Sequence, residues 1–182
     1  MDFITQLDHS IFFFINHLPH TPELNQLFLL FSYNPVVVWG VLALILIFFQ
    51  KGKNFHFLID LFGALFLAAI ITSVIIKPLI GRPRPDLSHG ESVIIVTEAP
   101  AAVAFNNDYA FPSGHAAVAF AGAYVMSRKF AKGKKWFYAV AILTALSRIY
   151  LGKHYFSDVF VGGMIGVGIG YLLTKYFGFS KS

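Results

Sequence analysis

Residues 57–76 read FLIDLFGALFLAAIITSVII, a run of twenty residues in which Asp60 is the one charged side chain. A helix of about 20 mostly apolar residues is long enough to cross the hydrocarbon core of a bilayer. The rest of the chain has the same character. Of its 182 residues, 57% are hydrophobic and 13% are charged, whereas soluble domains carry about 25% charged residues. The sequence therefore predicts an integral membrane protein built from helices.

The composition excludes several other classes of protein. A soluble fold with these proportions would expose large apolar patches and aggregate, and a disordered chain does not carry 21 Phe and 2 Trp. Because the chain contains 0 Cys, disulfides, thiolate zinc sites and cysteine nucleophiles are ruled out. A net charge of +5 could indicate nucleic acid, but basic cytoplasmic loops are the commoner cause in a membrane protein. We therefore expect no nucleic-acid partner.

Five stretches are candidate membrane spans. The third and fourth are short as purely apolar runs, so they reach spanning length only if polar residues at their ends face protein. The five are residues 24–49 with a kink at Asn34-Pro35, residues 57–76, residues 116–125 with their flanks, residues 136–146 and residues 159–177.

The N-terminal stretch, residues 3–18, has apolar side chains at helical spacing. It would be about 24 Å long as a helix, which is short of a hydrocarbon core of about 30 Å. Asp8 in its middle also disfavours spanning. We expect a helix that lies in the membrane interface, with a sixth span as the alternative. The predicted fold is an all-α membrane-embedded helical bundle of five, alternatively six, spans, formed by residues 1–182 as a single domain.

The Lys and Arg residues separate into two groups if the spans alternate in direction. Nine of the fourteen follow the first span, lie between the third and fourth, or follow the fifth. Cytoplasmic loops are enriched in Lys and Arg. We therefore expect this larger group on the cytoplasmic side of a bacterial inner or plasma membrane. The smaller group would face the periplasm or the cell exterior. Its members are Lys77, Arg82, Arg84, Arg148 and Lys153.

Three short segments gather on that outer side: KPLIGRPRP at 77–85, FPSGH at 111–115 and SRIYLGKHYFSD at 147–158. Lys77, Arg84 and Arg148 place three cations at span boundaries, with Asp158 as the firm counter-charge nearby. Each cation alone is typical of an interfacial anchor. Together they leave a surplus of about two positive charges, which favours an anion with more than one charge, and Arg and Lys suit phosphate oxygens.

The second and third segments add groups that could bind an anion or take part in a reaction. Ser113 can cap a helix and Gly114 lets a ligand approach the backbone, although a plain helix start fits Pro-Ser-Gly-His equally well. A helix N-terminus attracts anions. His154 and Asp158 are one helical turn apart, so the carboxylate can orient the imidazole and leave its other nitrogen as a nucleophile or base. Ionisable residues just inside a span are functional by default.

These motifs resemble those of the type 2 phosphatidic acid phosphatase superfamily. The order is Lys-x6-Arg-Pro from Lys77, Pro-Ser-Gly-His at 112–115 and Ser-Arg-x5-His-x3-Asp ending at Asp158. The family includes lipid phosphatases, undecaprenyl pyrophosphate phosphatases, lipid A phosphatases and soluble vanadium haloperoxidases. Phe156 departs from the pattern, because many bacterial members have Pro there, but the position is not catalytic.

The resemblance implies a metal-independent lipid phosphatase that needs no cofactor and forms a phosphohistidine. His154 would attack phosphorus, Asp158 would orient it, and His115 would protonate the leaving oxygen and then activate water. The phosphate would be held by Lys77, Arg84, Ser113, Gly114 and Arg148. The substrate would be a lipid phosphate such as undecaprenyl pyrophosphate, phosphatidylglycerol phosphate, phosphatidic acid or a lipid A phosphate.

A small transporter or channel is the alternative, because charges at span ends and Gly-rich helices suit it too. Against it, the charges gather at one face of the membrane, whereas a transport path needs polar residues near the midplane.

Residues 86–110 are expected to form a short interfacial helix over the active site, with Asp86, Glu91 and Asp108 able to pair with Arg82 or with head-group amines. Gly162-x3-Gly166 indicates close helix packing. The oligomeric state is left open, a monomer included.

Overall fold

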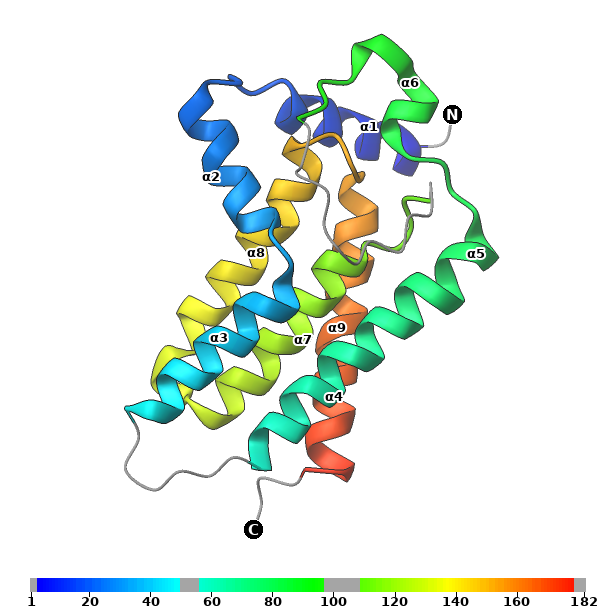
Figure 1. Ribbon diagram of the computed structural model, residues 1–182. Coiled ribbons are helices and arrows are strands. Elements are labelled where there is room, and N and C mark those ends of the chain that lie inside the picture. The colour runs from blue at the N-terminus through cyan, green and yellow to red at the C-terminus, as the bar shows by residue number, and fades with distance from the viewer. Residues whose placement is uncertain (1–2, 50–55, 97–108, 179–182) are drawn as a thin grey trace.

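The computed structural model describes residues 3–49, 56–96 and 109–178, and the described chain is helical throughout its regular structure (Figure 1). Short 3-10 turns, η2 (Gly90–Ser92) and η3 (Ala131–Gly133), join some of the helices. The helices are α1 (Phe3–Asn16), α2 (Pro22–Ser32), α3 (Pro35–Phe48), α4 (His56–Ile70), the π-helical η1 (Ile71–Ile76), α5 (Lys77–Ile80), α6 (Pro85–His89), α7 (Gly114–Lys129), α8 (Lys134–Tyr150) and α9 (Phe156–Tyr176).

The chain makes five passes along the bundle, in the order predicted. The first is α2 with α3, the second is the continuous α4, η1 and α5, and the others are α7, α8 and α9 (Figure 1). The expected kink in the first pass is a break, because α2 and α3 meet at 76°. Thr21 caps α2 and Asn34 caps α3, each followed by Pro at the start of its helix, so the sequence starts a new helix at residue 35.

Two passes are shorter than the other three. On length and composition, His56–Ile80 and Phe156–Tyr176 can each cross a membrane, and the bent pair makes a third span if it counts as one. By contrast, α7 has 16 residues and α8 has 17, or about 24 and 26 Å. Their ends carry Ser113, Gly114, Ser147 and Arg148, of which all but Gly114 are buried, as the predicted protein-facing polar ends require.

Helix α7 lies at the centre of the bundle and packs against α3, α4, α8 and α9. It is rich in Ala and Gly, so its neighbours approach closely. A Cβ added at Gly162 would lie 2.4 Å from the Ser113 carbonyl oxygen, and one at Gly166 would lie 2.1 Å from the Ala117 carbonyl oxygen. The close packing predicted for this pair of glycines is therefore confirmed. Both glycines make these contacts with α7 and the residue that caps it, within one chain.

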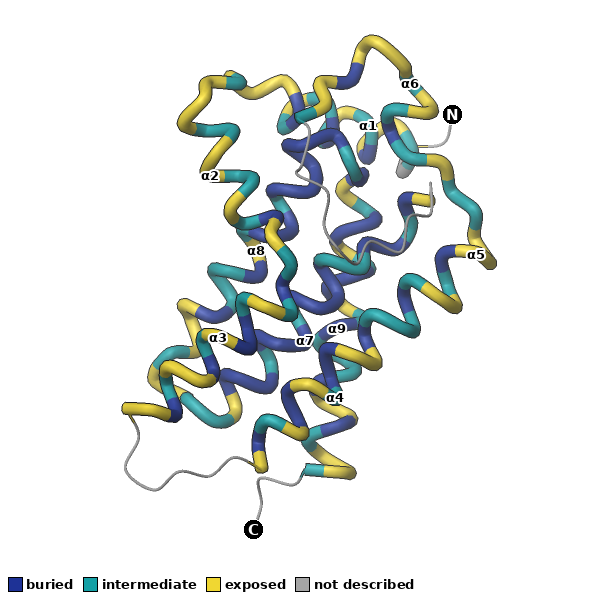
Figure 2. The backbone as a smooth tube through the Cα atoms, in the orientation of Figure 1, coloured by how far each residue is buried: buried dark blue, intermediate teal, exposed yellow. Residues whose placement is uncertain are grey.

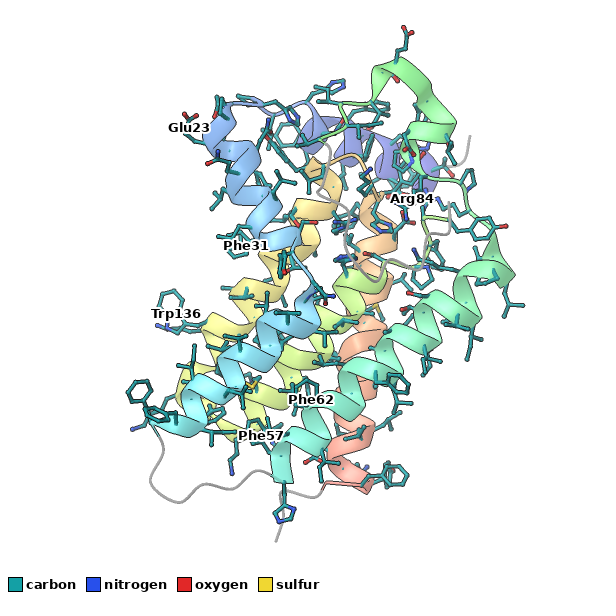
Figure 3. The ribbon with its side chains drawn as sticks, in the orientation of Figure 1. Glu23, Phe31, Phe57, Phe62, Arg84 and Trp136 are labelled. Atoms are coloured by element: carbon teal, nitrogen blue, oxygen red, sulfur yellow. The ribbon has the colours of Figure 1, made fainter. Side chains whose placement is uncertain are left out.

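The sides of the bundle are apolar and exposed, as a lipid-facing surface requires. Figure 2 shows exposed positions along the outer faces of the helices and buried ones along α7. Trp136 and Phe48 are 66% and 73% exposed, and Figure 3 shows Trp136 projecting away from α8. The all-α membrane bundle is thus the observed fold.

Helix α1 lies across one end of the bundle, beside α6 (Figure 1), and with 14 residues it is not among the described helices that are long and apolar enough to cross a membrane. We call this end the site end. Asn16 is fully buried there and donates to the carbonyls of Ile94 and Tyr150 at 2.8 and 2.9 Å, while its own carbonyl side-chain oxygen accepts from the Ile94 N–H at 2.9 Å. These bonds tie the end of α1 to the end of α8.

The connection between α5 and α7 is described only in part. The helix described in it is α6 at Pro85–His89, at the start of the stretch in which we expected a short interfacial helix, and residues 93–96 are not helical. Residues 97–108 lie outside the described residues. Arg82 and Ala110 close the connection, because the Ala110 N–H donates to the Arg82 carbonyl at 2.7 Å.

Candidate active site

The FPSGH segment places its residues at the start of α7. Ser113 is fully buried and caps the helix, since its Oγ accepts from the Ala116 N–H at 3.4 Å. The Ser113 N–H donates to the Asp158 carbonyl at 2.9 Å, which joins the start of α7 to the start of α9. Gly114 lets the Ser73 side chain approach α7, since a Cβ there would lie 2.7 Å from the Ser73 Oγ and would force that side chain to shift. His115 follows in the first turn and is half-buried.

The turn between α8 and α9 delivers His154. Gly152 has φ +75°, a conformation that side chains disfavour, and a Cβ there would lie 2.7 Å from the Ile94 carbonyl oxygen. The N–H groups of Lys153 and His154 both donate to the Arg148 carbonyl, at 3.0 and 3.2 Å. The turn thus holds His154 beside the end of α8, where its side chain is 2% exposed.

His154 and Asp158 face each other across the first turn of α9. The Nδ1 of His154 lies 3.7 Å from the Oδ2 of Asp158, just beyond hydrogen-bond distance, and has no other partner. The same Oδ2 accepts from the Tyr155 N–H at 2.8 Å, which makes Asp158 part of the N-terminal cap of α9. With Nδ1 turned toward a carboxylate, Nε2 is the nitrogen left to react.

The three predicted cations surround the two histidines. Lys77 is buried directly after the π-helical turn η1, and its Nζ donates to the Tyr109 carbonyl at 3.0 Å. Arg148 is buried and its Nη1 donates to the Ser32 Oγ at the end of α2. Arg84 stands just before α6, at the site end (Figure 3). All three act electrostatically on both imidazoles, those of His115 and His154.

Burial, together with this surrounding charge, sets the protonation state of His154. Burial, followed by the positive charges of Lys77, Arg148 and Arg84, lowers the pKa of His154 well below its ordinary value of 6.5. The imidazole is therefore neutral at neutral pH, with a lone pair for nucleophilic attack. The eight residues that the motifs single out lie together at the site end. They are Lys77, Arg84, Ser113, Gly114, His115, Arg148, His154 and Asp158.

Sequence reasoning missed two charged residues of this site. Arg82, for which Asp86, Glu91 and Asp108 were the expected partners, donates from Nη1 to the Oδ1 of Asp158 and from Nη2 to the Oδ2 of Asp8, both at 2.7 Å. Its partners are therefore not Asp86 or Glu91, and Asp108 lies outside the described residues. The signal available was Asp8 itself, a charge in the middle of an apolar helical face.

A cavity of about 500 Å³ opens beside this network. Its aromatic walls include Tyr155, on which His9 stacks at 5.3 Å between ring centroids, and His89, whose ring meets that of His9 edge-on at 4.8 Å. The cavity adjoins Asp158 through Arg82 and Ser157. Its lining residues are Thr5, Asp8, His9, Arg82, Pro83, Ser88, His89, Tyr155 and Ser157.

Comparison with known proteins shows the family of this chain. The model of the PAP2 superfamily matches residues 57–182, which include all three motifs, and the chain belongs to that superfamily. It is a membrane phosphatase that acts on lipid phosphates. A lipid A 4'-phosphatase from Porphyromonas gingivalis is 28% identical over 190 residues, which cover 100% of this chain and 78% of that protein.

Two solved structures share the fold. The crystal structure of Aquifex aeolicus LpxE has 30% sequence identity and a TM-score of 0.74, covering 93% of this chain and 96% of that one. The transmembrane PAP2 type phosphatidylglycerolphosphate phosphatase from Bacillus subtilis has 22% identity and a TM-score of 0.64, covering 100% and 89%. The prediction of a membrane PAP2 protein is confirmed.

Proposed function

We propose that this phosphatase removes a phosphate monoester from the sugar head group of a lipid A type lipid, through a phosphohistidine at His154. The observation that carries the catalytic part is the buried His154–Asp158 pair, opposite Lys77, Arg84 and Arg148. A neutral imidazole beside a carboxylate is an activated nucleophile. Three cations are suited to the charge that spreads over the oxygens of a transferring phosphoryl group.

The proposed reaction has two displacements at phosphorus. First, His154 Nε2 forms a bond to phosphorus as the bond to the lipid oxygen breaks, and His115 gives that oxygen its proton. Water then attacks the phosphohistidine, His115 accepts the proton of the water, and the phosphorus–nitrogen bond breaks to release inorganic phosphate. The start of α7 lies beside these groups, and the Gly114 N–H there can donate to the phosphate, whereas the Ser113 N–H donates to the Asp158 carbonyl.

No metal ion is needed in this proposal. Among the described residues, no group of three His, Cys, Asp or Glu side chains could hold one. The positive charge that a metal would supply comes from Lys77, Arg84 and Arg148. We therefore expect phosphate release to survive EDTA.

Two observations favour lipid A among lipid phosphates. A lipid A 4'-phosphatase is one of the relatives that match this chain over its whole length. The cavity beside Asp158 combines aromatic faces with Ser, Thr, Asp and His side chains, a lining that suits a hydroxyl-rich sugar. The transporter alternative is not favoured, because the charged site lies at one end of the bundle.

The test is phosphate release by the purified protein in detergent, with EDTA, from four lipids compared at equal surface concentration. They are lipid A, undecaprenyl pyrophosphate, phosphatidylglycerol phosphate and phosphatidic acid. The highest kcat/KM on lipid A supports the substrate proposal, and a higher value on another lipid replaces it. Loss of all activity in EDTA, with recovery in Mg²⁺, would contradict the site chemistry.

A further inference from the structure

Asp8 is a buried carboxylate on a helix that lies across the site end. Its side chain is 5% exposed, and a buried charge is costly unless it is paired and hydrogen-bonded. Both carboxylate oxygens of Asp8 accept hydrogen bonds. Its Oδ2 accepts from Arg82 Nη2 at 2.7 Å and from the Ser157 Oγ at 2.6 Å, and its Oδ1 accepts from the Ser157 N–H at 2.8 Å.

Arg82 connects this carboxylate to the catalytic one. Its Nη1 donates to Asp158 Oδ1 and to the Ser157 Oγ, both at 2.7 Å, and its guanidinium carbon lies 4.1 Å from the centre of the Tyr155 ring. A planar guanidinium held by two carboxylates and an aromatic face has one orientation. Asp158 is consequently fixed on both oxygens, by Arg82 on Oδ1 and by the Tyr155 N–H on Oδ2.

The charges of Asp8, Arg82 and Asp158 explain why a second carboxylate, that of Asp8, is present beside Arg82. Arg82 alone would neutralise Asp158 and leave the pair with no net charge toward His154. Because Asp8 neutralises Arg82, the group of Asp8, Arg82 and Asp158 keeps one negative charge. When His154 attacks phosphorus, its ring becomes cationic, and a fixed negative charge beside Nδ1 stabilises that state.

We propose that Asp8 and Arg82 are positioning residues for the reaction, which hold Asp158 in place and preserve its negative charge for His154. Helix α1 then belongs to the catalytic apparatus and is not only an interfacial anchor. Asp8 lies outside residues 57–182, the part of the chain that the superfamily model matches. The inference rests on the proposed phosphohistidine chemistry.

The experiment compares three variants with the wild-type protein, using the lipid that the wild type hydrolyses fastest. Asp8→Asn keeps the shape and removes the charge, and we expect kcat to fall by about 10–100-fold, the usual effect of losing a carboxylate that supports a reacting histidine, with KM nearly unchanged. Arg82→Gln should lose activity as well. The double variant Asp8→Asn with Arg82→Gln restores the single negative charge and should have a higher kcat than Asp8→Asn alone.

Recovery of kcat in the double variant without a matching recovery of thermal stability is the decisive result, because removing both members of a buried ion pair can restore stability by itself. A double variant as slow as or slower than Asp8→Asn would overturn the proposal, as would a wild-type kcat in Asp8→Asn. Glu23→Gln is the matched control: it removes an exposed carboxylate at the same end, in the first turn of α2, and should leave kcat unchanged.

The test can still be carried out if one of the variants does not fold. Each variant is first checked for a single symmetric peak in size exclusion. If Asp8→Asn fails this check, Arg82→Lys replaces it, since Lys keeps the charge but cannot span two carboxylates. A fall in kcat at constant KM then supports the proposal, and wild-type kcat refutes it. Phosphate release by the wild type tests the proposed function separately, so the two failures are distinguishable.

Discussion

The backbone N–H of Ser113 donates a 2.9 Å hydrogen bond to the carbonyl of Asp158. This bond joins the start of α7, which carries His115, to the start of α9, which carries the partner of His154. The carbonyl of Ser113 in turn lies against Gly162, one turn further along α9. The spacing between the proposed acid and the proposed nucleophile therefore depends on how closely two helices pack.

Gly162→Ala should disturb that spacing. The new Cβ would lie 2.4 Å from the Ser113 carbonyl oxygen, so the two helix starts must separate. We expect a loss of about 1–3 kcal/mol in stability, typical of overpacking, and a large fall in kcat. Gly168→Ala is the control, because nothing lies within 4 Å of its Cβ position. Thermal unfolding and phosphate release in detergent measure both effects; equal behaviour of the two variants would contradict the packing argument.

His154→Ala should abolish turnover while the protein stays folded, because the proposed nucleophile is removed. Single turnovers with ³²P-labelled lipid, quenched in alkaline detergent because the phosphorus–nitrogen bond is labile in acid, should leave label on the wild-type protein and none on the variant. Recovery of more than a small percentage of wild-type phosphate release would show that another group attacks phosphorus.

His115→Ala should slow the reaction by roughly 10²–10⁴-fold, the usual contribution of a general acid. The loss should be smaller for an aryl phosphate, whose leaving group needs no proton, than for a lipid phosphate with a poor leaving group. Parallel kinetics on the two substrates check this. A uniform loss would argue that His115 binds phosphate and does not donate a proton.

The rate of phosphohistidine formation should hold in mildly acidic solution. The reaction needs neutral His154, and burial with the charges of Lys77, Arg148 and Arg84 places the pKa of His154 well below 6.5. Asp158 and His115 face the same ring. The acid limb of the single-turnover pH profile should therefore lie below pH 6.5. Arg84→Gln removes one positive charge and should move that limb upward; a limb that stays fixed would contradict the electrostatic cause.

The active site should face the periplasm or the cell exterior. The described basic residues of the α7–α8 connection lie at the end of the bundle opposite the site, and such residues favour the cytoplasm. The chain has 0 Cys, so single cysteines report cleanly. Ser88→Cys, at an exposed position of α6, should react with a membrane-impermeant maleimide in intact cells or spheroplasts. Ala131→Cys, exposed at the other end, should react only after lysis. The reverse pattern would place the chemistry in the cytoplasm.

Much of the site could be anticipated from local sequence, because its members stand at helix ends with short, regular spacing. His154 and Asp158 are four positions apart, the spacing of one helical turn, and Pro-Ser-Gly-His starts a helix on capping rules alone. The apolar runs likewise determine which segments are helices. The break at Tyr33–Asn34 was underestimated as a kink, because a proline shows where a helix restarts but not the 76° at which it does so.

The connections between distant parts of the chain were decided only by the tertiary structure. Composition and apolar patterning identify a membrane bundle, and motif spacing identifies a phosphate site at one end, because both depend on residues close together in sequence. Asp8 bonds Arg82, which is 74 positions away in the sequence, and Arg82 bonds Asp158, which is 76 positions further on. Both contacts depend on how α1 crosses the end of the bundle. A lone carboxylate in an apolar helix signals that it needs a partner, and packing alone determines which one it finds.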